Sequence, residues 1–328
     1  MSPRVAVLLS TYNGARWLRP QLDSLLSQTF ADWTLWARDD GSSDDSAAIL
    51  ADYARRDPRV RVFSDDAGHL GAQKSFFKLI EKADTDSPYL ALCDQDDVWR
   101  QDKLQITLAA MRRLENGQDA VPALVHTDLR IVDKDLRVLY PSGKRHLRWQ
   151  VLEGDFLARL LAQNVVTGCT TMINRALARA ATPLPKEAMM HDWWLALVAA
   201  ALGRVAYLDE ATVEYRQHDS NASGSAVRRR PFYDGVLRVL TRPEHFELLM
   251  DGRFRQCAAL ERHLARFPPT PAGRRASNFL AGARRGRVGA ALAAWRNGVL
   301  MQGAARNALF YLLLLKRPYL KPDGDIAL

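Results

Sequence analysis

The sequence predicts an α/β fold, with a Rossmann-like, mostly parallel sheet flanked by helices and a helical C-terminal appendage. Short apolar runs that end in polar loops alternate with helical patterns through the first hundred residues. This alternation is typical of a parallel sheet with helices on both faces. Three of the first four expected strands are followed directly by polar residues, and ligands of such sheets bind beyond the carboxyl ends of the strands. The sequence therefore also predicts where the site lies.

Four strands and three helices are expected in regular order over the first part of the chain. The run "RVAVLLST" ends in a polar loop, and the leucines that follow it recur at helical spacing. The acidic turn "GSSDD" offers N-cap residues for the second helix. The expected strands are 4–11, 33–40, 59–63 and 89–94, and the expected helices fall within 16–29, 46–56 and 68–83.

The middle of the chain is expected to be mixed. Residues 123–133 read as a strand, 164–177 as a strand turning into a helix, and 205–218 as a strand pair or hairpin. A helix is expected to begin near His191 and Asp192, with Gly203 as its C′ cap. Residues 220–230 read as a polar, basic link, and the rest as helices. We therefore expect one domain over 1–225 and a basic, mainly helical region over 226–328.

The net charge of +9 is unevenly distributed along the chain. Residues 227–328 hold 19 Lys and Arg against 7 Asp and Glu, which gives +12, whereas residues 1–226 hold 27 against 30, which gives −3. Such a basic region is either a solvated helical surface or a surface that attracts an anionic membrane or an acidic acceptor. No nucleic-acid-binding motif accompanies it, so we expect no nucleic-acid partner.

Cysteine usage and hydropathy predict a cytoplasmic protein. The three cysteines are far apart and form no C-x-x-C pair, which favours a reducing compartment. The first apolar run is too short for a signal peptide core. No stretch approaches the roughly 20 apolar residues that span a bilayer.

The stretch "LALCDQDDVW" places three acids at the end of an apparently buried strand. Like charges repel, and a carboxylate drawn out of water needs a partner. Carboxylate oxygens suit Mg²⁺ or Mn²⁺, which commonly keep positions for a substrate phosphate. The motif predicts a divalent cation site; the alternative is a solvated acidic loop.

Other residues near the expected strand ends suggest a nucleotide site. Asp39 and Asp40 end the second strand, where an acid accepts hydrogen bonds from a base or a ribose, or serves as a turn and N-cap acid. Tyr12, between Thr11 and Asn13, offers a ring for base stacking. Lys74 opens the third helix, where a cation and the helix N-terminus hold phosphate, unless it is an ordinary surface lysine.

Two later motifs complete the set of candidates. In "HDWW" a carboxylate at a helix start precedes two indoles, a pattern that suggests a general base beside a flat sugar-binding wall. Its alternative is a helix N-terminal acid followed by core tryptophans. His218 ends "EYRQH" as a metal or phosphate ligand, or as a structural histidine. Signatures of serine hydrolases, zinc proteases, P-loop NTPases and Rossmann dehydrogenases are missing.

Taken together, these residues resemble the family 2 glycosyltransferases with the GT-A fold, over about residues 4–225. The motifs that resemble the family, and its rhamnosyltransferase-like branch, are "VAVLLSTYNGARWLRPQLDSLLSQTF", "WARDDGSSDDS", "CDQDDVW", "TGCTTMINRAL", "HDWWLAL" and "YRQH". Many members have Glu-Asp where this chain has His191-Asp192. That departure keeps the acid but leaves no family role for the histidine.

The resemblance implies a role for each matching residue. Asp192 matches the catalytic base, Asp96 the metal ligand, and His218 completes the metal or diphosphate site. The nucleotide-sugar donor would be bound by Thr11, Tyr12, Asn13, Asp39, Lys74 and Asp94. The acceptor side would be lined by Gly168, Cys169, His191, Trp193 and Trp194.

The implied activity is an inverting, Mg²⁺- or Mn²⁺-dependent transfer of a sugar to a hydroxyl of a glycan or lipid-linked acceptor. The branch suggests dTDP-L-rhamnose as donor and bacterial surface polysaccharide, such as O-antigen of lipopolysaccharide, as the pathway. A sugar nucleotidyltransferase and a non-catalytic nucleotide-sugar or glycan-binding subunit are the alternatives. The first would need an N-terminal Gly-rich triphosphate loop, and "STYNGARW" has one glycine.

A lipid-linked acceptor would give the basic C-terminal region a role at the inner face of the cytoplasmic membrane. Val288, Leu292, Trp295 and Val299 fall on one expected helical face, a pattern typical of interfacial helices. A packed helical appendage or a homodimer contact is the alternative.

Overall fold

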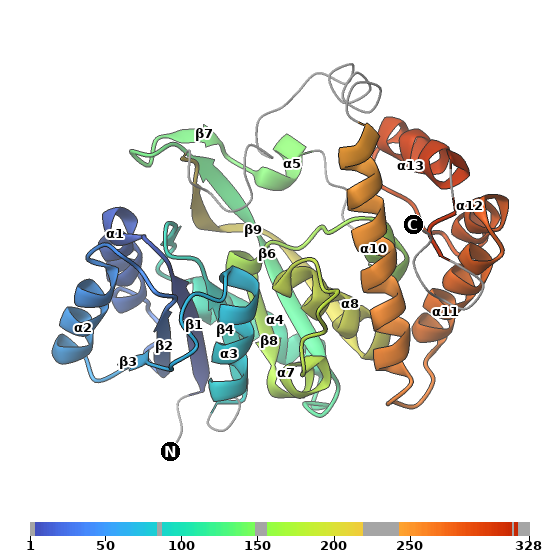
Figure 1. Ribbon diagram of the computed structural model, residues 1–328. Coiled ribbons are helices and arrows are strands. Elements are labelled where there is room, and N and C mark those ends of the chain that lie inside the picture. The colour runs from blue at the N-terminus through green and yellow to red at the C-terminus, as the bar shows by residue number, and fades with distance from the viewer. Residues whose placement is uncertain (1–3, 84–86, 148–155, 219–242, 317, 321–328) are drawn as a thin grey trace. The chain divides into compact units, whose positions relative to one another are not determined.

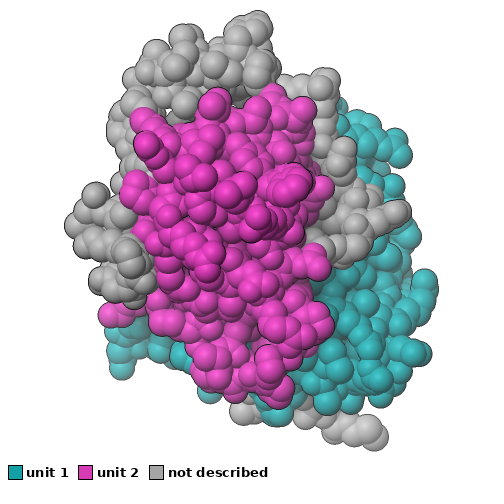
Figure 2. Space-filling view, turned by 90° about the vertical axis from the view of Figure 1, so that its right-hand side faces the viewer, with its two compact units in different colours: residues 1–146, 166–184, 203–224 teal, residues 147–165, 185–202, 225–328 magenta. Residues whose placement is uncertain are grey.

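The computed structural model describes residues 4–83, 87–147, 156–218, 243–316 and 318–320. The chain divides into two compact units, which Figure 2 shows in different colours. Unit 1 holds residues 1–146, 166–184 and 203–224, and unit 2 holds residues 147–165, 185–202 and 225–328. Two segments of the expected first domain therefore cluster with the C-terminal helices, and the division at 225 stays a prediction. The expected link at 220–230 lies outside the described residues.

Unit 1 is built on a sheet of nine strands in the order β3-β2-β1-β4-β8-β6-β9-β5, with β7 on β6 (Figure 1). The strands are β1 (Val5–Thr11), β2 (Trp33–Asp39), β3 (Val60–Phe63), β4 (Tyr89–Cys93), β5 (Val98–Trp99), β6 (Ala123–Val132), β7 (Val138–Tyr140), β8 (Thr171–Asn174) and β9 (Arg204–Arg216). The parallel ladders are the long ones, and the antiparallel ladders at β5, β7 and β8 are short. The expected α/β fold with a mostly parallel sheet is confirmed.

Helices connect and cover these strands. Those of unit 1 are α1 (Ala15–Leu26), α2 (Ser46–Arg56), α3 (Ala72–Ala83), α4 (Lys103–Glu115), α5 (Gly143–Leu147), the 3₁₀ turn η1 (Gly168–Thr170) and α7 (Arg175–Ala181). Because parallel crossovers are right-handed, α1 and α2 cover one face of the sheet and α3 covers the other. The leucines of α1 at 18, 22 and 25 are buried, as their helical spacing predicts.

The strand order reverses between β1 and β4, and the predicted site residues that end or follow β1, β2 and β4 lie at this edge. Thr11 at the end of β1 pairs in register with Asp39 at the end of β2. On the other side of β1, Leu9 pairs with Cys93, so the acidic motif begins directly beyond β4. Residues of β1 and β4 are almost completely buried, which explains their continuous apolar runs. The expected convergence of polar residues at this edge is confirmed.

The expected strand pair or hairpin at 205–218 is wrong. Residues 204–216 form one continuous strand, β9, parallel to β6. The register shifts where Thr127 pairs with Leu208 and Asp128 with Ala211, so Asp209 and Glu210 are extra residues on β9. Both are exposed. This polar pair is therefore a bulge within one strand.

Gly203 ends the predicted helix, but for another reason than the one expected. Its φ is not among the positive values of the chain, so it is no left-handed C′ cap. A Cβ at this position would lie 1.8 Å from the carbonyl oxygen of Pro122. The glycine is needed because the backbone of β9 approaches the residue before β6.

Unit 2 is helical. Its helices are α6 (Phe156–Ala162), α8 (His191–Leu202), α10 (Pro243–Leu264), α11 (Pro271–Arg284), α12 (Arg287–Arg296) and α13 (Ala304–Lys316). The expected helical C-terminal region and the helix start at His191 are confirmed. Among the described residues, no helix is both long and apolar enough to cross a membrane.

The predicted apolar face of α12 is shorter than expected. Val288, Leu292 and Trp295 are exposed on the helix, whereas Val299 lies beyond its end and is buried. Gly298 has φ +66° and donates to the Trp295 carbonyl, while Val299 donates to the Ala294 carbonyl. These two bonds form a Schellman motif, which turns the chain inward before Val299.

Candidate active site

The acidic motif forms the loop between β4 and the short strand β5. Asp94, Gln95 and Asp96 are partly buried, and Asp97 is fully buried. Asp97 therefore has a different environment from Asp94 and Asp96, although the three acids are neighbours in the sequence. The alternative of a fully solvated acidic loop does not fit this burial.

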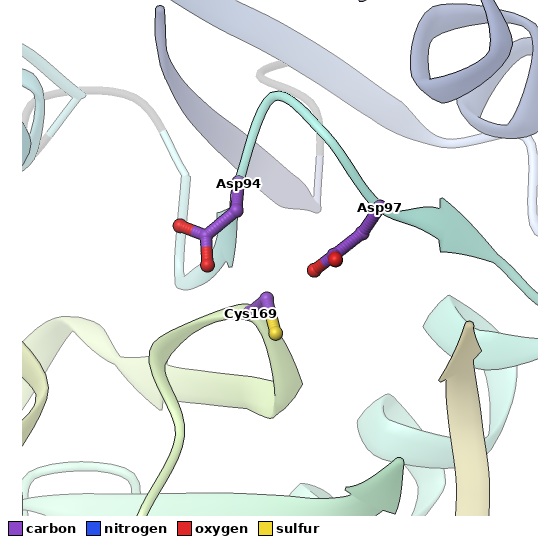
Figure 3. A group of neighbouring side chains, drawn as sticks. All are labelled: Asp94, Asp97 and Cys169. Atoms are coloured by element: carbon purple, nitrogen blue, oxygen red, sulfur yellow. The ribbon is translucent and has the colours of Figure 1, made fainter. Parts of the chain in front are cut away.

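Two of these acids converge on a cysteine from another part of unit 1 (Figure 3). Ligand atoms of Asp94, Asp97 and Cys169 all lie within 4.8 Å of one another. Burial raises the pKa of Asp97 well above its usual value, and the charges of Asp96 and Asp94 raise it further. Burial likewise raises the pKa of the Cys169 thiol, as do the neighbouring acids. The surroundings of Asp97 and Cys169 therefore favour their protonated forms.

A buried lysine lies near the same cluster. Lys103 opens α4, is 1% exposed, and holds its Nζ 4.2 Å from the centre of the Trp99 ring. Burial lowers the pKa of Lys103 to about 8, while the charges of Cys169, Cys93 and Asp97 oppose that shift. Lys103 and the Asp97 of the motif are thus buried ionisable groups, and neither was predicted to have a role of its own.

Asp96 and His218 are in contact, as two ligands of one metal ion must be close together. Nε2 of His218 lies 2.8 Å from Oδ2 of Asp96. The imidazole also stacks on Trp17 of α1, with ring centres 5.2 Å apart and planes 20° from parallel. A hydrogen bond and an aromatic stack therefore fix the orientation of His218 beside the carboxylate.

Arg216 ties the end of β9 to the same motif. Its Nε donates to the Asp96 carbonyl at 2.8 Å, and its backbone N–H donates to Oδ1 of Asp97 at 3.2 Å. The guanidinium carbon lies 4.7 Å from the centre of the Trp17 ring. Arg216 and Trp17 thus hold the acidic loop and His218 together, a role that the sequence alone did not reveal.

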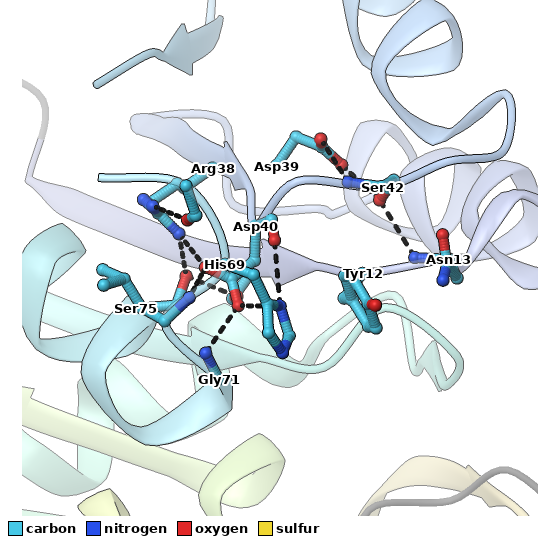
Figure 4. Close-up of polar contacts among 12 residues, drawn as sticks. Tyr12, Asn13, Arg38, Asp39, Asp40, Ser42, His69, Gly71 and Ser75 are labelled. Atoms are coloured by element: carbon cyan, nitrogen blue, oxygen red, sulfur yellow. Dashed lines mark hydrogen bonds and ion pairs between the residues drawn. The ribbon is translucent and has the colours of Figure 1, made fainter. Parts of the chain in front are cut away.

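The loop after β1 is fixed by the loop after β2 (Figure 4). The Asn13 N–H donates to Ser42 Oγ at 2.9 Å, and Ser43 N–H donates to Asn13 Oδ1 at 2.8 Å. Asp39 accepts from Ser42, whose N–H lies 3.0 Å from its Oδ2. Asp39 therefore acts as a turn acid while remaining only half-buried. The Tyr12 ring is 44% exposed and lies 4.2 Å from the His69 ring.

Asp40, next to Asp39, is committed to structure (Figure 4). It is buried, forms an ion pair with Arg38, and accepts from the N–H groups of Leu70 at 2.9 Å and Gly71 at 2.8 Å. Arg38 is also buried and binds Asp65 through two hydrogen bonds. The Arg38 hydrogen bond lowers the pKa of Asp65. This network joins β2 to the loop before α3, so Asp39, the less buried of the two acids, is the candidate that contacts a nucleoside.

Lys74 lies in the first turn of α3, and it is exposed. Its neighbour Ser75 is buried and accepts hydrogen bonds from Ser10 at 2.7 Å and Arg38 at 3.0 Å. The start of α3 is therefore attached to β1 and β2, and Lys74 stands on a fixed helix turn. Its phosphate-binding role stays a prediction.

The predicted base and its neighbours belong to unit 2. Asp192 is 7% exposed in the first turn of α8. Its Oδ1 accepts from Nδ2 of Asn164 at 3.1 Å and from the N–H of Trp193 at 2.6 Å. The carboxylate is therefore oriented by two donors. Asn164 was not among the predicted site residues, because its partner lies 28 residues away and their contact is set by tertiary packing.

The residues around Asp192 resemble a core more than an open wall. Trp194 is fully buried, and Trp193 is 6% exposed with its indole N–H bound to the Leu160 carbonyl at 2.7 Å. His191 is buried, and burial lowers its pKa to about 4. These observations favour the alternative of core tryptophans after a helix N-terminal acid. The acceptor-side role of the three residues stays a prediction, as does that of Gly168, which opens η1 beside Cys169.

The donor groups of unit 1 fit a divalent cation. Asp96 offers a carboxylate oxygen, which Mg²⁺ and Mn²⁺ prefer, and His218 offers an imidazole nitrogen beside it. Asp94 and Asp97 offer further carboxylate oxygens, grouped with Cys169. Burial raises the pKa of Asp97, and the charges of Asp96 and Asp94 raise it further; a cation would offset these charges. Cys169 is the poorer donor, because burial favours its neutral thiol.

A model of the family described as "Glycosyl transferase family 2" matches residues 6–177. The dTDP-rhamnosyl transferase RfbG of Shigella flexneri is 25% identical over 235 residues, covering 69% of this chain and 76% of that protein. The putative teichuronic acid biosynthesis glycosyltransferase TuaG of Bacillus subtilis is 26% identical over 226 residues, covering 68% and 82%.

Solved structures share the fold. TarS residues 1–349 of S. aureus, in complex with UDP-GlcNAc, match with a TM-score of 0.52 at 14% identity, over 77% of this chain and 66% of that one. The match thus spans just under two thirds of the TarS fragment. The mannosyltransferase PcManGT of Pyrobaculum calidifontis, in complex with GDP-Man and Mn²⁺, matches with a TM-score of 0.52 at 15% identity, over 91% and 74%. These likenesses confirm the expected GT-A fold.

Proposed function

Because the chain belongs to glycosyl transferase family 2 and is a glycosyltransferase, we propose that it transfers a sugar from a nucleotide donor to an acceptor hydroxyl with inversion and with the help of a divalent cation. In this proposal residues 1–225 carry donor binding and catalysis. The observation that carries it is the meeting of Asp96 and His218 at the strand edge where Thr11 and Asp39 also lie. The Mn²⁺ in the PcManGT complex supports the choice of cation.

The nucleotide would be held by the ends of β1, β2 and β4. Tyr12 offers an exposed ring to a base, and Asp39 offers a half-buried carboxylate to base or ribose donors. Lys74 and the first turn of α3 offer positive charge to phosphate. Asp94 would contact the nucleotide sugar. TarS and PcManGT are titled with bound UDP-GlcNAc and GDP-Man, which supports a nucleotide-sugar partner.

Proton removal is assigned to Asp192. The two hydrogen bonds from Asn164 and Trp193 end on its Oδ1 and orient the carboxylate. In the proposed displacement Asp192 takes the proton of the acceptor hydroxyl, whose oxygen attacks the anomeric carbon opposite the nucleotide. A divalent cation held by Asp96 and His218 would neutralise charge on the departing diphosphate.

The transferred sugar is proposed to be L-rhamnose, given by dTDP-L-rhamnose. The motifs of the rhamnosyltransferase-like branch and the likeness to the Shigella flexneri dTDP-rhamnosyl transferase support this choice. The acceptor would be a glycan or lipid-linked saccharide of bacterial surface polysaccharide synthesis, such as O-antigen. The likeness to the putative teichuronic acid biosynthesis enzyme supports a polysaccharide pathway.

Peripheral contact with an anionic membrane, at its cytoplasmic face, is proposed through α12. Val288, Leu292 and Trp295 are 57%, 47% and 71% exposed and recur at helical spacing. Arg287 and Arg296 stand exposed at the two ends of this apolar stripe. Between Glu261 and Asp323 the sequence holds 12 Lys and Arg and no Asp or Glu. Apolar side chains flanked by arginines, without acids, complement an anionic bilayer surface.

Thermal unfolding in the presence of a panel of nucleotide sugars tests the function. Ligands that bind the folded state raise the unfolding temperature by mass action. We expect dTDP-L-rhamnose to stabilise the chain only with Mn²⁺ or Mg²⁺, and Asp96→Ala to abolish the shift. UDP-GlcNAc and GDP-mannose serve as competing donors. Stabilisation by a donor without any turnover of it would favour the non-catalytic binding alternative, and no stabilisation by any donor would contradict the proposal.

A further inference from the structure

Gln95 lies between Asp94 and Asp96 in the acidic motif, and its side chain reaches back to the end of β1. Its Oε1 accepts from Thr11 Oγ1 at 2.6 Å and from the Tyr12 N–H at 2.8 Å. Its Nε2 donates to the Tyr12 carbonyl at 3.1 Å. Both polar groups of the Tyr12 peptide backbone are therefore bound by one amide side chain, which acts like a neighbouring strand.

The loop is shaped around this amide. Gly14, which precedes α1, is buried, and a Cβ at this position would lie 2.1 Å from Oε1 and 2.4 Å from Cδ of Gln95. The φ of Gly14 is −106°, which other residues adopt freely. Glycine is thus required for space, because the loop closes directly over the Gln95 amide.

The contacts of Gln95 join two halves of one proposed site. Tyr12 carries the ring offered to the base, and the neighbours of Gln95 are the acids offered to the cation and the donor. The loop after β2 binds the same loop from the other side, through the hydrogen bond from the Asn13 N–H to Ser42 Oγ. Movement of the acidic motif on binding a metal-bound diphosphate would therefore be transmitted to Thr11 and Tyr12 through three hydrogen bonds.

We propose that Gln95 is a positioning residue that couples the nucleoside half of the site to the cation and diphosphate half. This inference rests on the proposed function. It goes further, because it predicts that nucleoside binding and cation binding strengthen each other through the Gln95 amide, and that the strand-end loop and the acidic loop act as one unit.

The test uses Gln95→Met, which keeps the length of the side chain and removes all three hydrogen bonds. The dissociation constants of dTDP with and without Mn²⁺ are measured by calorimetry on the full chain. We expect dTDP to bind about tenfold more weakly, and the gain in dTDP affinity that Mn²⁺ gives the unmodified chain to shrink. The affinity for Mn²⁺ alone should change little, which a general loss of folding would not produce.

Gly14→Ala provides an independent variant, because its methyl group must displace the Gln95 amide. It should weaken the binding of dTDP as Gln95→Met does, and the double variant should bind dTDP no more weakly than either single variant. Additive losses, or Gln95→Met with unchanged dTDP affinity and unchanged Mn²⁺ coupling, would overturn the inference. Failure of the unmodified chain to bind dTDP would instead overturn the proposed function, so the two failures are distinguishable.

Discussion

Nε2 of His218 lies 2.8 Å from Oδ2 of Asp96, although 122 residues separate them in the sequence. The contact joins the acidic loop after β4 to the residues that follow β9. Trp17 stacks on the imidazole, and Arg216 binds the backbone of Asp96. The position of His218 is therefore determined by several elements, which is expected of a ligand that must be oriented before a cation binds.

Replacing His218 with alanine is predicted to raise the Mn²⁺ concentration needed for half-maximal sugar transfer about tenfold or more. The variant loses one proposed ligand while Asp96 remains. His146→Gln is the matched control, because the His146 ring stacks on the Tyr140 ring, with their centres 3.6 Å apart, and His146 is not among the proposed ligands. An unchanged Mn²⁺ requirement in His218→Ala would remove His218 from the cation site.

Asp192→Asn is predicted to lower kcat by roughly 10²–10⁴-fold, the usual contribution of a general base. Asparagine retains an oxygen that accepts from Asn164 and Trp193, so the fold of unit 2 should persist. The affinity for dTDP should stay the same. Glu187→Gln, which alters an acid paired with Arg262 in the same unit, is the control. Near-normal turnover of a folded Asp192→Asn protein would disprove its role as the base.

Trp295→Ala is predicted to reduce binding to phosphatidylglycerol vesicles about tenfold or more. The exposed indole would become buried in the bilayer interface, and burial of a large apolar side chain contributes about 1.5–3 kcal/mol. Co-sedimentation at low salt measures this binding, and added salt should weaken it. Leu248 is 68% exposed on α10 and lies outside the acid-free stretch, so Leu248→Ala is the control. If the unmodified chain does not co-sediment with anionic vesicles, α12 does not bind a membrane. A dimer measured in solution would then favour the homodimer alternative.

Acid is predicted to destabilise the chain through His126. Burial lowers the pKa of its imidazole from 6.5 to about 3. Below pH 6.5 the unfolded chain binds a proton there that the folded chain does not, so the free energy of unfolding falls as the pH falls. The slope is about 1.4 kcal/mol per pH unit for this group. Urea unfolding between about pH 7 and about pH 5 should show a flatter slope for His126→Gln; identical slopes would contradict the assignment.

The hydrophobic periodicity, and the rule that ligands bind beyond the carboxyl ends of parallel strands, predicted the framework of the site. The short apolar runs identified the strands because β1 and β4 are buried on both faces, and the parallel order placed Thr11, Asp39 and Asp94 at one edge. The motif resemblance brought Asp96 and His218 to one site before their contact was known. These features depend on local pattern and on topology, which a sequence expresses directly.

Side-chain networks between distant segments were not predictable in the same way. The sequence contains Gln95, Arg216 and Trp17 within or beside recognised motifs, but their partners are set by tertiary packing that leaves no periodic signal. Likewise, the bulge at Asp209 mimics a turn, and Gly298 redirects the chain before Val299 continues the apolar face. The bulge is set by pairing with β6, which is distant in sequence, whereas the turn at Gly298 is a local helix end that the apolar periodicity does not express.

The central claim is that the acids beyond β4 hold a cation that in turn holds a nucleoside diphosphate. Electron paramagnetic resonance of Mn²⁺, titrated with the chain in the presence and absence of dTDP, tests it most directly. The account predicts that dTDP strengthens Mn²⁺ binding about tenfold or more, and that Asp96→Asn abolishes this gain. The claim would be contradicted if the affinity for Mn²⁺ did not change with dTDP, or if the gain from dTDP persisted unchanged in Asp96→Asn.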